Sequence, residues 1–176
     1  MSDTNSFEKH ISFIQSQTNK ALMKIPLNSN LSRYFYDPIK YVLKGKGKRL
    51  RPVLVHLSGQ VYEAHPDDLM KLSVAVELLH NFSLVHDDIM DKAPLRRGQP
   101  TVHHKWNDNI AILSGDVMLV KAYQQLSKTN SDVLAEVMEL FNITAIEVCE
   151  GQQMDMDFEK LTNISQAEYI HMIKLK

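Results

Sequence analysis

The sequence predicts an all-α fold, and three observations support this class. Apolar residues recur at three- and four-residue spacing through most of the 176 residues, which is the pattern of amphipathic helices. Glycine and proline contribute only 6 residues each and separate long segments rather than filling them. The hydrophobic content of 44% and the charged content of 23% are ordinary for a folded protein. We therefore expect one helical domain over residues 1–176.

The segments before the longest helix predict three further helices. One is expected over residues 7–25, and the residues expected along its apolar face are Phe7, Ile11, Ile14, Ala21 and Met23. Residues 31–43 are less regular, because Pro38 must begin a helix or kink one. The valines of residues 53–64 would suit a strand, but Pro52 at a first helical position and the unbroken length favour a helix.

The strongest helical prediction covers residues 67–91. This segment begins with two aspartates, which stabilise a helix N-terminus, and runs without a breaker until Pro94. The remaining helices are expected over residues 109–128, 131–160 and 165–176. Ser165 with Glu168 forms a capping box for the last of these. The helical pattern stops without a C-terminal cap, so we expect the domain to continue beyond this sequence.

Composition and charge exclude several classes of function. The net charge of −1 provides no general attraction for nucleic acid. A single cysteine, Cys149, rules out an internal disulfide and fits a reducing compartment. The first ten residues lack the apolar core of a signal peptide, and no apolar run approaches the roughly 18 residues of a membrane span. A cytoplasmic protein that binds no nucleic acid is expected.

Carboxylates near the end of the longest predicted helix suggest a metal site. Asp87 and Asp91 lie one helical turn apart, on a face that they share with His80. Like charges at this spacing disfavour a helix, and burying them among apolar neighbours costs more. A divalent cation would offset both costs, and oxygen ligands from a single helix edge suit Mg²⁺. The alternative is that these acids pair with Arg96 and Arg97.

A basic segment suggests a binding site for phosphate groups. The sequence KGKGKRLRP carries the cations Lys44, Lys46, Lys48, Arg49 and Arg51. Glycine lets the backbone approach an anion, and arginine supplies a fork that matches phosphate. The alternative is a basic surface loop that contacts nucleic acid, but neither interleaved aromatic residues nor a net basic charge accompanies it. With the arginine pair, the sequence predicts one metal-binding edge and two phosphate-binding edges.

These motifs resemble those of the trans-isoprenyl diphosphate synthases, which include farnesyl and geranylgeranyl diphosphate synthases. The matching stretches are GKGKRLRP, ELLHNFSLVHDDIMDKAPLRRGQPTVH, AILSGDVML, GQQMD and YIHMIKLK, which lie between residues 40 and 176. The resemblance implies a multi-helix isoprenoid synthase bundle with a central cavity, of which this chain is the N-terminal portion. It also implies a homodimer. A second aspartate-rich motif is expected beyond Lys176, so the chain alone is expected to be incomplete for turnover.

The resemblance also implies a role for each matched residue. Asp87 and Asp91 would hold Mg²⁺ that bridges to the diphosphate of an allylic substrate, and Asp88 would support them. The residues implied to bind the allylic diphosphate are Arg96, Gln152, Asp155 and Lys176. The residues implied to bind isopentenyl diphosphate are Lys48, Arg51, His80 and Arg97. The implied reaction is departure of diphosphate from the allylic substrate, attack of the isopentenyl double bond on the resulting cation, and loss of a proton.

Three further points concern the product and the alternatives. In this family the product grows beneath the aspartate motif, so the bulky Phe82, followed by Ser83, implies a product of farnesyl or geranylgeranyl length. Phe82 could instead serve only as a core residue. Asn107 stands where the family commonly has glycine, and we expect it to accept a left-handed conformation. A class I terpene cyclase and a non-catalytic partner subunit of a prenyl synthase remain alternative functions.

Overall fold

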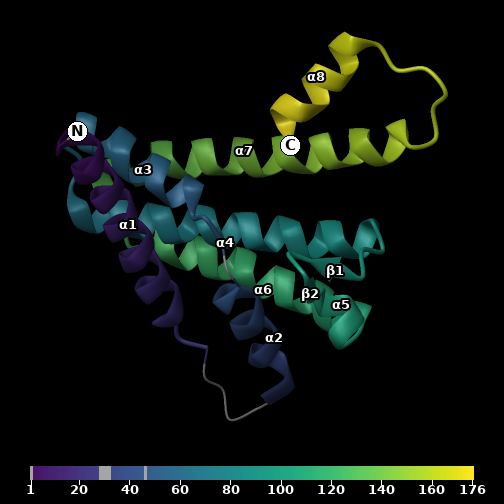
Figure 1. Ribbon diagram of the computed structural model, residues 1–176, viewed down its shortest axis with the longest axis horizontal. Coiled ribbons are helices and arrows are strands. Elements are labelled where there is room, and N and C mark those ends of the chain that lie inside the picture. The colour runs from purple at the N-terminus through teal and green to yellow at the C-terminus, as the bar shows by residue number, and fades with distance from the viewer. Residues whose placement is uncertain (1, 28–32, 46) are drawn as a thin grey trace. The chain divides into compact units, whose positions relative to one another are not determined.

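A computed structural model describes residues 2–27, 33–45 and 47–176, and it confirms the all-α prediction (Figure 1). These residues form eight helices, which are α1 (Ser2–Met23), α2 (Arg33–Lys44), α3 (Leu50–Val61), α4 (Pro66–Met90), α5 (Val102–Lys105), α6 (Asp108–Leu126), α7 (Ser131–Phe158) and α8 (Gln166–Leu175). A two-stranded antiparallel hairpin consists of β1 (Leu95–Arg96) and β2 (Gln99–Pro100). The chain divides into two compact units, which meet in sequence between Asn130 and Ser131.

Helix α4 is the centre of the first unit. It packs against α1, α3, α5 and α6, and its contact with α6 is the most extensive in the unit (Figure 1). The largest fully buried apolar side chains come from α1, α2, α4 and α6, and they are Leu22, Ile39, Leu43, Leu78, Met118 and Leu126. These helices therefore share one core, and burial of this apolar surface supplies the main favourable term in folding.

The apolar face predicted for the first helix is wrong in part. Phe7 is 57% exposed and Met23 is also exposed, whereas Ile14 is only 2% exposed. The side chains that α1 buries are Ile14, Thr18 and Leu22, which follow one another at four-residue spacing. At about 100° per residue, Met23 lies half a turn away from Ile14 and therefore points to solvent.

Both prolines of the early helices lie inside them. Helix α2 continues through Pro38 instead of beginning there. Helix α3 confirms the choice of helix over strand, but it begins at Leu50, so Pro52 is its third residue and not its first. A proline is tolerated there because the first backbone N–H groups of a helix have no partner within the helix. The residue before α3, Arg49, has a left-handed backbone with φ of 48°.

The helix starts in the rest of the chain follow their capping residues. Helix α4 begins at Pro66, and α8 has the predicted capping box between Ser165 and Glu168. The expectation for Asn107 is wrong, because its φ of −170° is extended and not left-handed. Asn107 is instead the N-cap of α6, and its side-chain oxygen accepts a hydrogen bond of 2.9 Å from the backbone N–H of Ile110.

The hairpin between α4 and α5 was not predicted. Its turn consists of Arg97 and Gly98, with φ values of 53° and 76°. Positive φ at both central residues defines the two-residue turns whose twist matches that of paired strands. The Tyr41 hydroxyl donates a hydrogen bond of 2.8 Å to the carbonyl oxygen of Pro100, which attaches the hairpin to α2. As a result, Arg96 lies in a strand while Arg97 lies in the turn.

In the second unit, α7 packs against α8. A Cβ atom on Gly151 would lie 2.9 Å from the Cβ of Leu175, so glycine allows the end of α8 to approach α7 closely.

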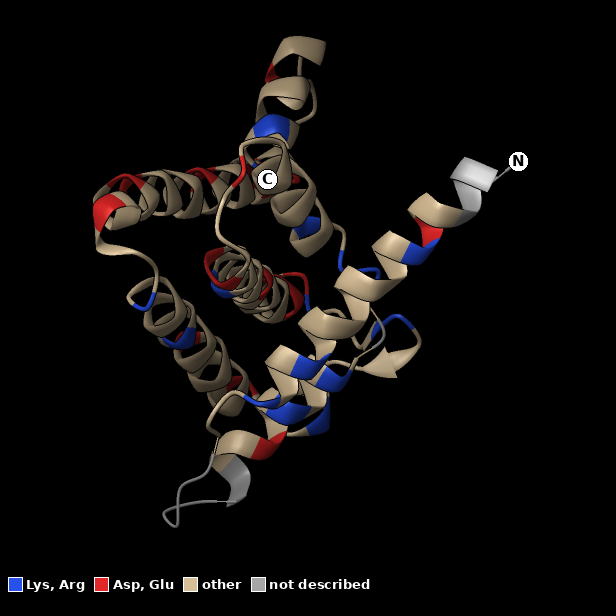
Figure 2. Ribbon diagram, turned by 90° about the vertical axis from the view of Figure 1, so that its left-hand side faces the viewer, with Lys and Arg blue, Asp and Glu red and all other residues tan. Residues whose placement is uncertain are grey.

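None of the helices in the described part of the chain is both long enough and apolar enough to cross a membrane. Acidic and basic positions can be followed along the ribbon in Figure 2.

The close approach of α6 to α4 gives a first prediction. A Cβ on Gly115 would lie 2.3 Å from Nε2 of His86, which is itself 3.1 Å from the carbonyl oxygen of Ile112. We expect Gly115→Ala to lower the free energy of unfolding by about 2 kcal/mol, because overpacking outweighs the gain of about 1 kcal/mol that alanine brings within a helix. Urea unfolding followed by circular dichroism measures the change. The exposed control Asn109→Ala, also in α6, should not lower stability, and a Gly115→Ala variant as stable as wild type would contradict the packing argument.

Candidate functional site

The predicted acidic cluster lies at the C-terminal end of α4. Asp87 and Asp88 belong to the last turn of the helix, and Asp91 is its C-cap. The backbone N–H of Asp91 donates a hydrogen bond of 2.9 Å to the carbonyl oxygen of Asp87, so the two residues are one turn apart, as predicted. Asp88 is only 4% exposed, whereas Asp91 is exposed.

Arg96 pairs with two of the three aspartates. Its Nε lies 2.8 Å from Oδ1 of Asp88, and its Nη2 lies 3.2 Å from Oδ2 of Asp87. Burial raises the pKa of Asp88, and the neighbouring Arg96 opposes this rise. The alternative to a metal site was that the aspartates pair with Arg96 and Arg97. For Arg96, this pairing is present in the structure.

The donor set at this end of α4 suits Mg²⁺ better than metals that need several protein ligands. The described residues contain no group of three or more His, Cys, Asp or Glu side chains arranged to hold a metal ion. Mg²⁺ commonly uses only one or two carboxylates and completes its coordination with water and substrate phosphate oxygens. Asp87 and Asp91, one turn apart at the end of a helix, can supply such a pair of carboxylates.

A basic cavity lies beside the middle of α4. Its volume is about 380 Å³, and its lining residues are Gly47, Lys48, Arg49, Leu50, Arg51, Glu77, His80 and Arg97. All four residues implied to bind isopentenyl diphosphate are among them. Lys44 is not part of the lining, and Lys46 lies outside the described residues. Cations outnumber the single carboxylate here, so the cavity attracts anions.

His80 is held neutral within this cavity. Burial lowers its pKa to about 4, and Arg51 and Arg97 add to this effect. Its Nε2 lies 3.3 Å from Nη1 of Arg51. A neutral histidine can contact a phosphate oxygen through a ring N–H, and it also orients the guanidinium group of Arg51.

The two adjacent arginines of the hairpin face different neighbours. Arg96 contacts the aspartates of α4, while Arg97 lines the basic cavity. Both also line a smaller cavity of about 130 Å³, to which Asn81 and Asp88 contribute. The turn at Arg97 and Gly98 explains this division, since it changes the backbone direction between the two side chains.

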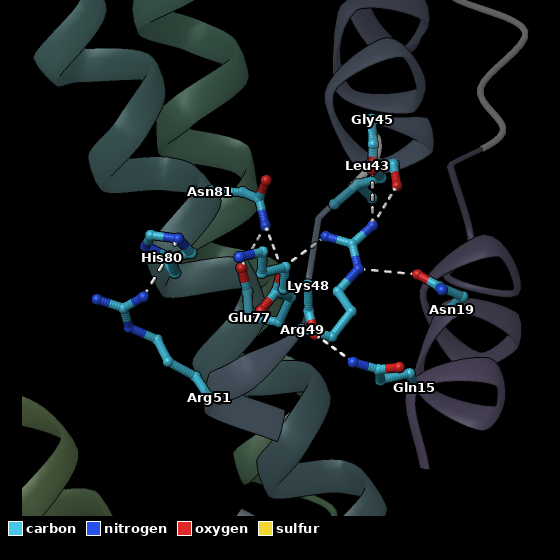
Figure 3. A network of polar contacts seen from close by, with 10 residues as sticks. All are labelled: Gln15, Asn19, Leu43, Gly45, Lys48, Arg49, Arg51, Glu77, His80 and Asn81. Atoms are coloured by element: carbon cyan, nitrogen blue, oxygen red, sulfur yellow. Dashed lines mark hydrogen bonds and ion pairs between the residues drawn. The ribbon is translucent and has the colours of Figure 1, made fainter. Parts of the chain in front are cut away.

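Sequence reasoning did not identify the structural role of Arg49. This residue is 4% exposed, and its Nη1 lies 2.6 Å from Oε1 of the buried Glu77 (Figure 3). Its other N–H groups donate to Asn19 and to backbone carbonyl oxygens of Leu43 and Gly45. Arg49 is therefore a buried connector rather than an open anion ligand. The acidic Glu77, within an otherwise apolar stretch of α4, was the only signal of such a partner in the sequence.

The two residues implied to limit chain length lie on α4 before the aspartates. Phe82 is half-buried, and its ring packs edge-to-face on His86 with 4.6 Å between the ring centroids. The Ser83 hydroxyl donates a hydrogen bond of 2.9 Å to the carbonyl oxygen of His80. Ser83 is thus tied to its own helix.

The remaining predicted site residues belong to the second unit. Gln152 and Asp155 lie on α7, and Lys176 follows α8. The Lys176 ammonium group forms an ion pair with the Asp155 carboxylate. Of the four residues implied for the allylic diphosphate, Asp155 and Lys176 are therefore in direct contact.

Comparison with known proteins gives a consistent result. A family model described as polyprenyl synthetase matches residues 32–176. The chain is 41% identical over 143 residues to a geranylgeranyl diphosphate synthase of Methanosarcina mazei. The alignment covers 80% of this chain and 44% of that protein. It is 45% identical over 135 residues to a geranylgeranyl diphosphate synthase of Saccharolobus solfataricus, covering 74% of this chain and 40% of that protein.

Solved structures agree with these relatives. A crystal structure of a geranylgeranyl pyrophosphate synthase matches 94% of this chain and 50% of its own, with a TM-score of 0.88 and 44% identity. The geranylgeranyl pyrophosphate synthetase from Pyrococcus horikoshii matches 97% of this chain and 54% of its own, with a TM-score of 0.89 and 34% identity. The chain spans less than half the length of the two curated relatives. This chain belongs to the polyprenyl synthetase family.

Proposed function

We propose that this chain is part of a short-chain trans-prenyl diphosphate synthase and carries its first aspartate-rich motif; the enzyme joins isopentenyl diphosphate to an allylic diphosphate and releases diphosphate. The observation that carries the proposal is the separation of two sites along α4. A basic cavity lies at His80, and a carboxylate edge lies at Asp87 and Asp91. The relatives named above are geranylgeranyl diphosphate synthases, which supports the same reaction class.

The basic cavity is proposed to bind isopentenyl diphosphate without a metal. Lys48, Arg51 and Arg97 line it, and charge-assisted hydrogen bonds to phosphate are among the stronger polar contacts in proteins. The low pKa of His80 keeps its ring uncharged at neutral pH, so it can donate a hydrogen bond without adding to the repulsion among the cations. The cavity would thus hold isopentenyl diphosphate in place until its double bond attacks the allylic cation.

The carboxylate edge is proposed to hold the allylic diphosphate through Mg²⁺. When bound to Asp87 and Asp91, this ion would supply positive charge that stabilises the departing diphosphate. Arg96 already contacts Asp87 and Asp88, so its guanidinium group lies beside the carboxylate edge, where it could donate hydrogen bonds to diphosphate oxygens. Gln152, Asp155 and Lys176 retain the allylic-diphosphate role that the resemblance implies.

Product length is proposed to depend on Phe82. This aromatic ring lies five positions before Asp87, half-buried on the helix that carries the aspartates. A rigid ring at that position would limit the space for a growing apolar chain, which favours products of farnesyl or geranylgeranyl length. The proposal also includes a cytoplasmic homodimer.

The alternative of a terpene cyclase is disfavoured by the basic cavity. A cyclase has one diphosphate substrate, whereas Arg96 and Arg97 here face two different groups of residues. A non-catalytic partner subunit would not require two aspartates one turn apart at an accessible helix end. Both alternatives therefore leave part of the observed arrangement unexplained.

Metal-free binding of isopentenyl diphosphate tests the basic cavity. We expect Lys48→Gln and Arg51→Gln each to weaken binding by about tenfold, because each removes a charged contact worth more than 1 kcal/mol. Isothermal titration of this chain in EDTA measures the affinities. Lys44→Gln is the matched control, since it removes a charge from the same basic sequence but does not line the cavity. Equal weakening by the control would show that general attraction, and not the cavity, binds the ligand.

Mg²⁺-dependent binding of a non-hydrolysable allylic diphosphate tests the carboxylate edge. The double variant Asp87→Asn, Asp91→Asn should lose the metal-dependent part of the affinity, because amide oxygens are poor substitutes for carboxylates at Mg²⁺. EDTA should produce the same loss in the wild-type chain. The control double variant Glu63→Gln, Asp67→Asn removes two charges near the opposite end of α4 and should bind normally. Wild-type binding that does not change with Mg²⁺ would contradict the metal assignment.

A further inference from the structure

Helix α1 contacts two residues that line the basic cavity, although α1 lies outside the region that the family model matches. That region begins at residue 32, whereas α1 ends at Met23. The Gln15 amide donates a hydrogen bond of 2.6 Å to the carbonyl oxygen of Lys48 (Figure 3). The side-chain oxygen of Asn19 accepts a hydrogen bond of 2.8 Å from Nε of Arg49. Two side chains of α1, one turn apart, therefore hold two successive residues of the basic segment, which we define as residues 47–51.

The contact with Arg49 connects α1 to the other helices around the cavity. One guanidinium group bonds to Asn19 of α1, to Glu77 of α4 and to the carbonyl oxygens of Leu43 and Gly45 at the end of α2. Asn81 donates to Glu77 from one turn further along α4. Lys48 and Arg51, two of the cations that line the cavity, therefore lie on a segment whose central residue is tied to three helices.

The backbone at Arg49 requires this support. Its φ of 48° and ψ of 40° are left-handed, which is unfavourable for a residue with a Cβ atom. Gly47 packs against the same group, since a Cβ there would lie 3.0 Å from Nη1 of Arg49 and 3.0 Å from Nη1 of Arg97. Both guanidinium groups therefore approach Gly47 closely, so a shift of the basic segment would change the surroundings of Arg49 and of Arg97.

The cations that line the cavity repel one another, so the contacts that hold the basic segment in place affect ligand binding. Lys48, Arg51 and Arg97 line one cavity, and like charges held together favour separation into solvent. An anion site binds strongly when its charges are already in place, because the ligand then does not have to order them. Contacts that fix the backbone on either side of Lys48 therefore raise affinity without touching the ligand.

We propose that Gln15 and Asn19 of α1 are positioning residues for the diphosphate cavity, and that they act by fixing the basic segment through the carbonyl of Lys48 and the guanidinium of Arg49. The identification of the ligand as isopentenyl diphosphate rests on the proposed function. The geometric part, that α1 immobilises residues 47–51, rests only on the contacts described here. The two parts can be tested separately.

The double variant Gln15→Ala, Asn19→Ala tests both parts in one experiment. Gln15 is half-buried and Asn19 is exposed, so the buried stripe that anchors α1, which is Ile14, Thr18 and Leu22, remains intact. We expect backbone amide exchange at Val53, whose N–H donates a hydrogen bond of 3.1 Å to the carbonyl oxygen of Arg49, to become faster, and metal-free binding of isopentenyl diphosphate to weaken by about tenfold. Hydrogen–deuterium exchange with mass spectrometry and isothermal titration of this chain provide the two measurements.

Two further variants separate positioning from general damage to α1. Asn19→Asp keeps an oxygen acceptor for Arg49, so it should bind within about twofold of wild type if the acceptor is what matters. The double variant Ser12→Ala, Ser16→Ala changes two exposed positions of the same helix and should leave both measurements unchanged.

The possible results distinguish this inference from the proposed function. Unchanged exchange at Val53 in the Gln15→Ala, Asn19→Ala variant would overturn the inference, whatever the ligand result. Equal effects in the Ser12→Ala, Ser16→Ala control would also overturn it. If the wild-type chain fails to bind isopentenyl diphosphate, the proposed function fails, while faster exchange in the variant still supports the role of α1 in fixing the segment.

Discussion

The ion pair between Arg49 and Glu77 is the contact on which the arrangement around the basic cavity depends. Both residues are only 4% exposed, so neither charge can be satisfied by water. Breaking a buried pair by removing one partner typically costs about 3–5 kcal/mol, because the other charge is left unpaired. The remaining N–H groups of Arg49 also need acceptors, and these come from Asn19 and from two carbonyl oxygens at the end of α2. One buried charge thereby joins α1, α2 and α4 at a single point.

Helix α4 carries several of the polar groups of the candidate site, and helical periodicity determines how deeply each is buried. Glu77 and Asn81 point inward and belong to the Arg49 network. His80 faces the basic cavity, where burial and arginine neighbours keep it neutral. Asp88 is buried against Arg96 at the end of the helix. The same helix therefore supplies a structural carboxylate, an uncharged cavity wall and an acidic edge, because successive residues point about 100° apart.

The hairpin after α4 gives two consecutive arginines different surroundings. Arg96 lies in β1 and neutralises the aspartates, while Arg97 lies in the turn and lines the basic cavity. The positive φ values of Arg97 and Gly98 make this change of direction possible. Where arginine meets aspartate, mutual pairing and ligand binding need not exclude each other, because a guanidinium group that holds carboxylates before a ligand arrives is already placed beside the ligand site.

The sequence by itself determined the helical class, the position of the longest helix and its one-turn spacing of aspartates, since these follow from local periodicity, capping and helix geometry. It also determined the capping box of α8 and the family, because the motif residues are close in sequence. Only the tertiary structure decided which cations face the cavity. Lys44, Lys48 and Arg49 look equivalent in sequence, yet Lys48 lines the cavity, Lys44 does not, and Arg49 is buried against Glu77. The buried face of α1 and the contacts of Gln15 and Asn19 were likewise decided by tertiary structure. Each depends on a partner that is distant in the sequence, so the local spacing of residues cannot predict it.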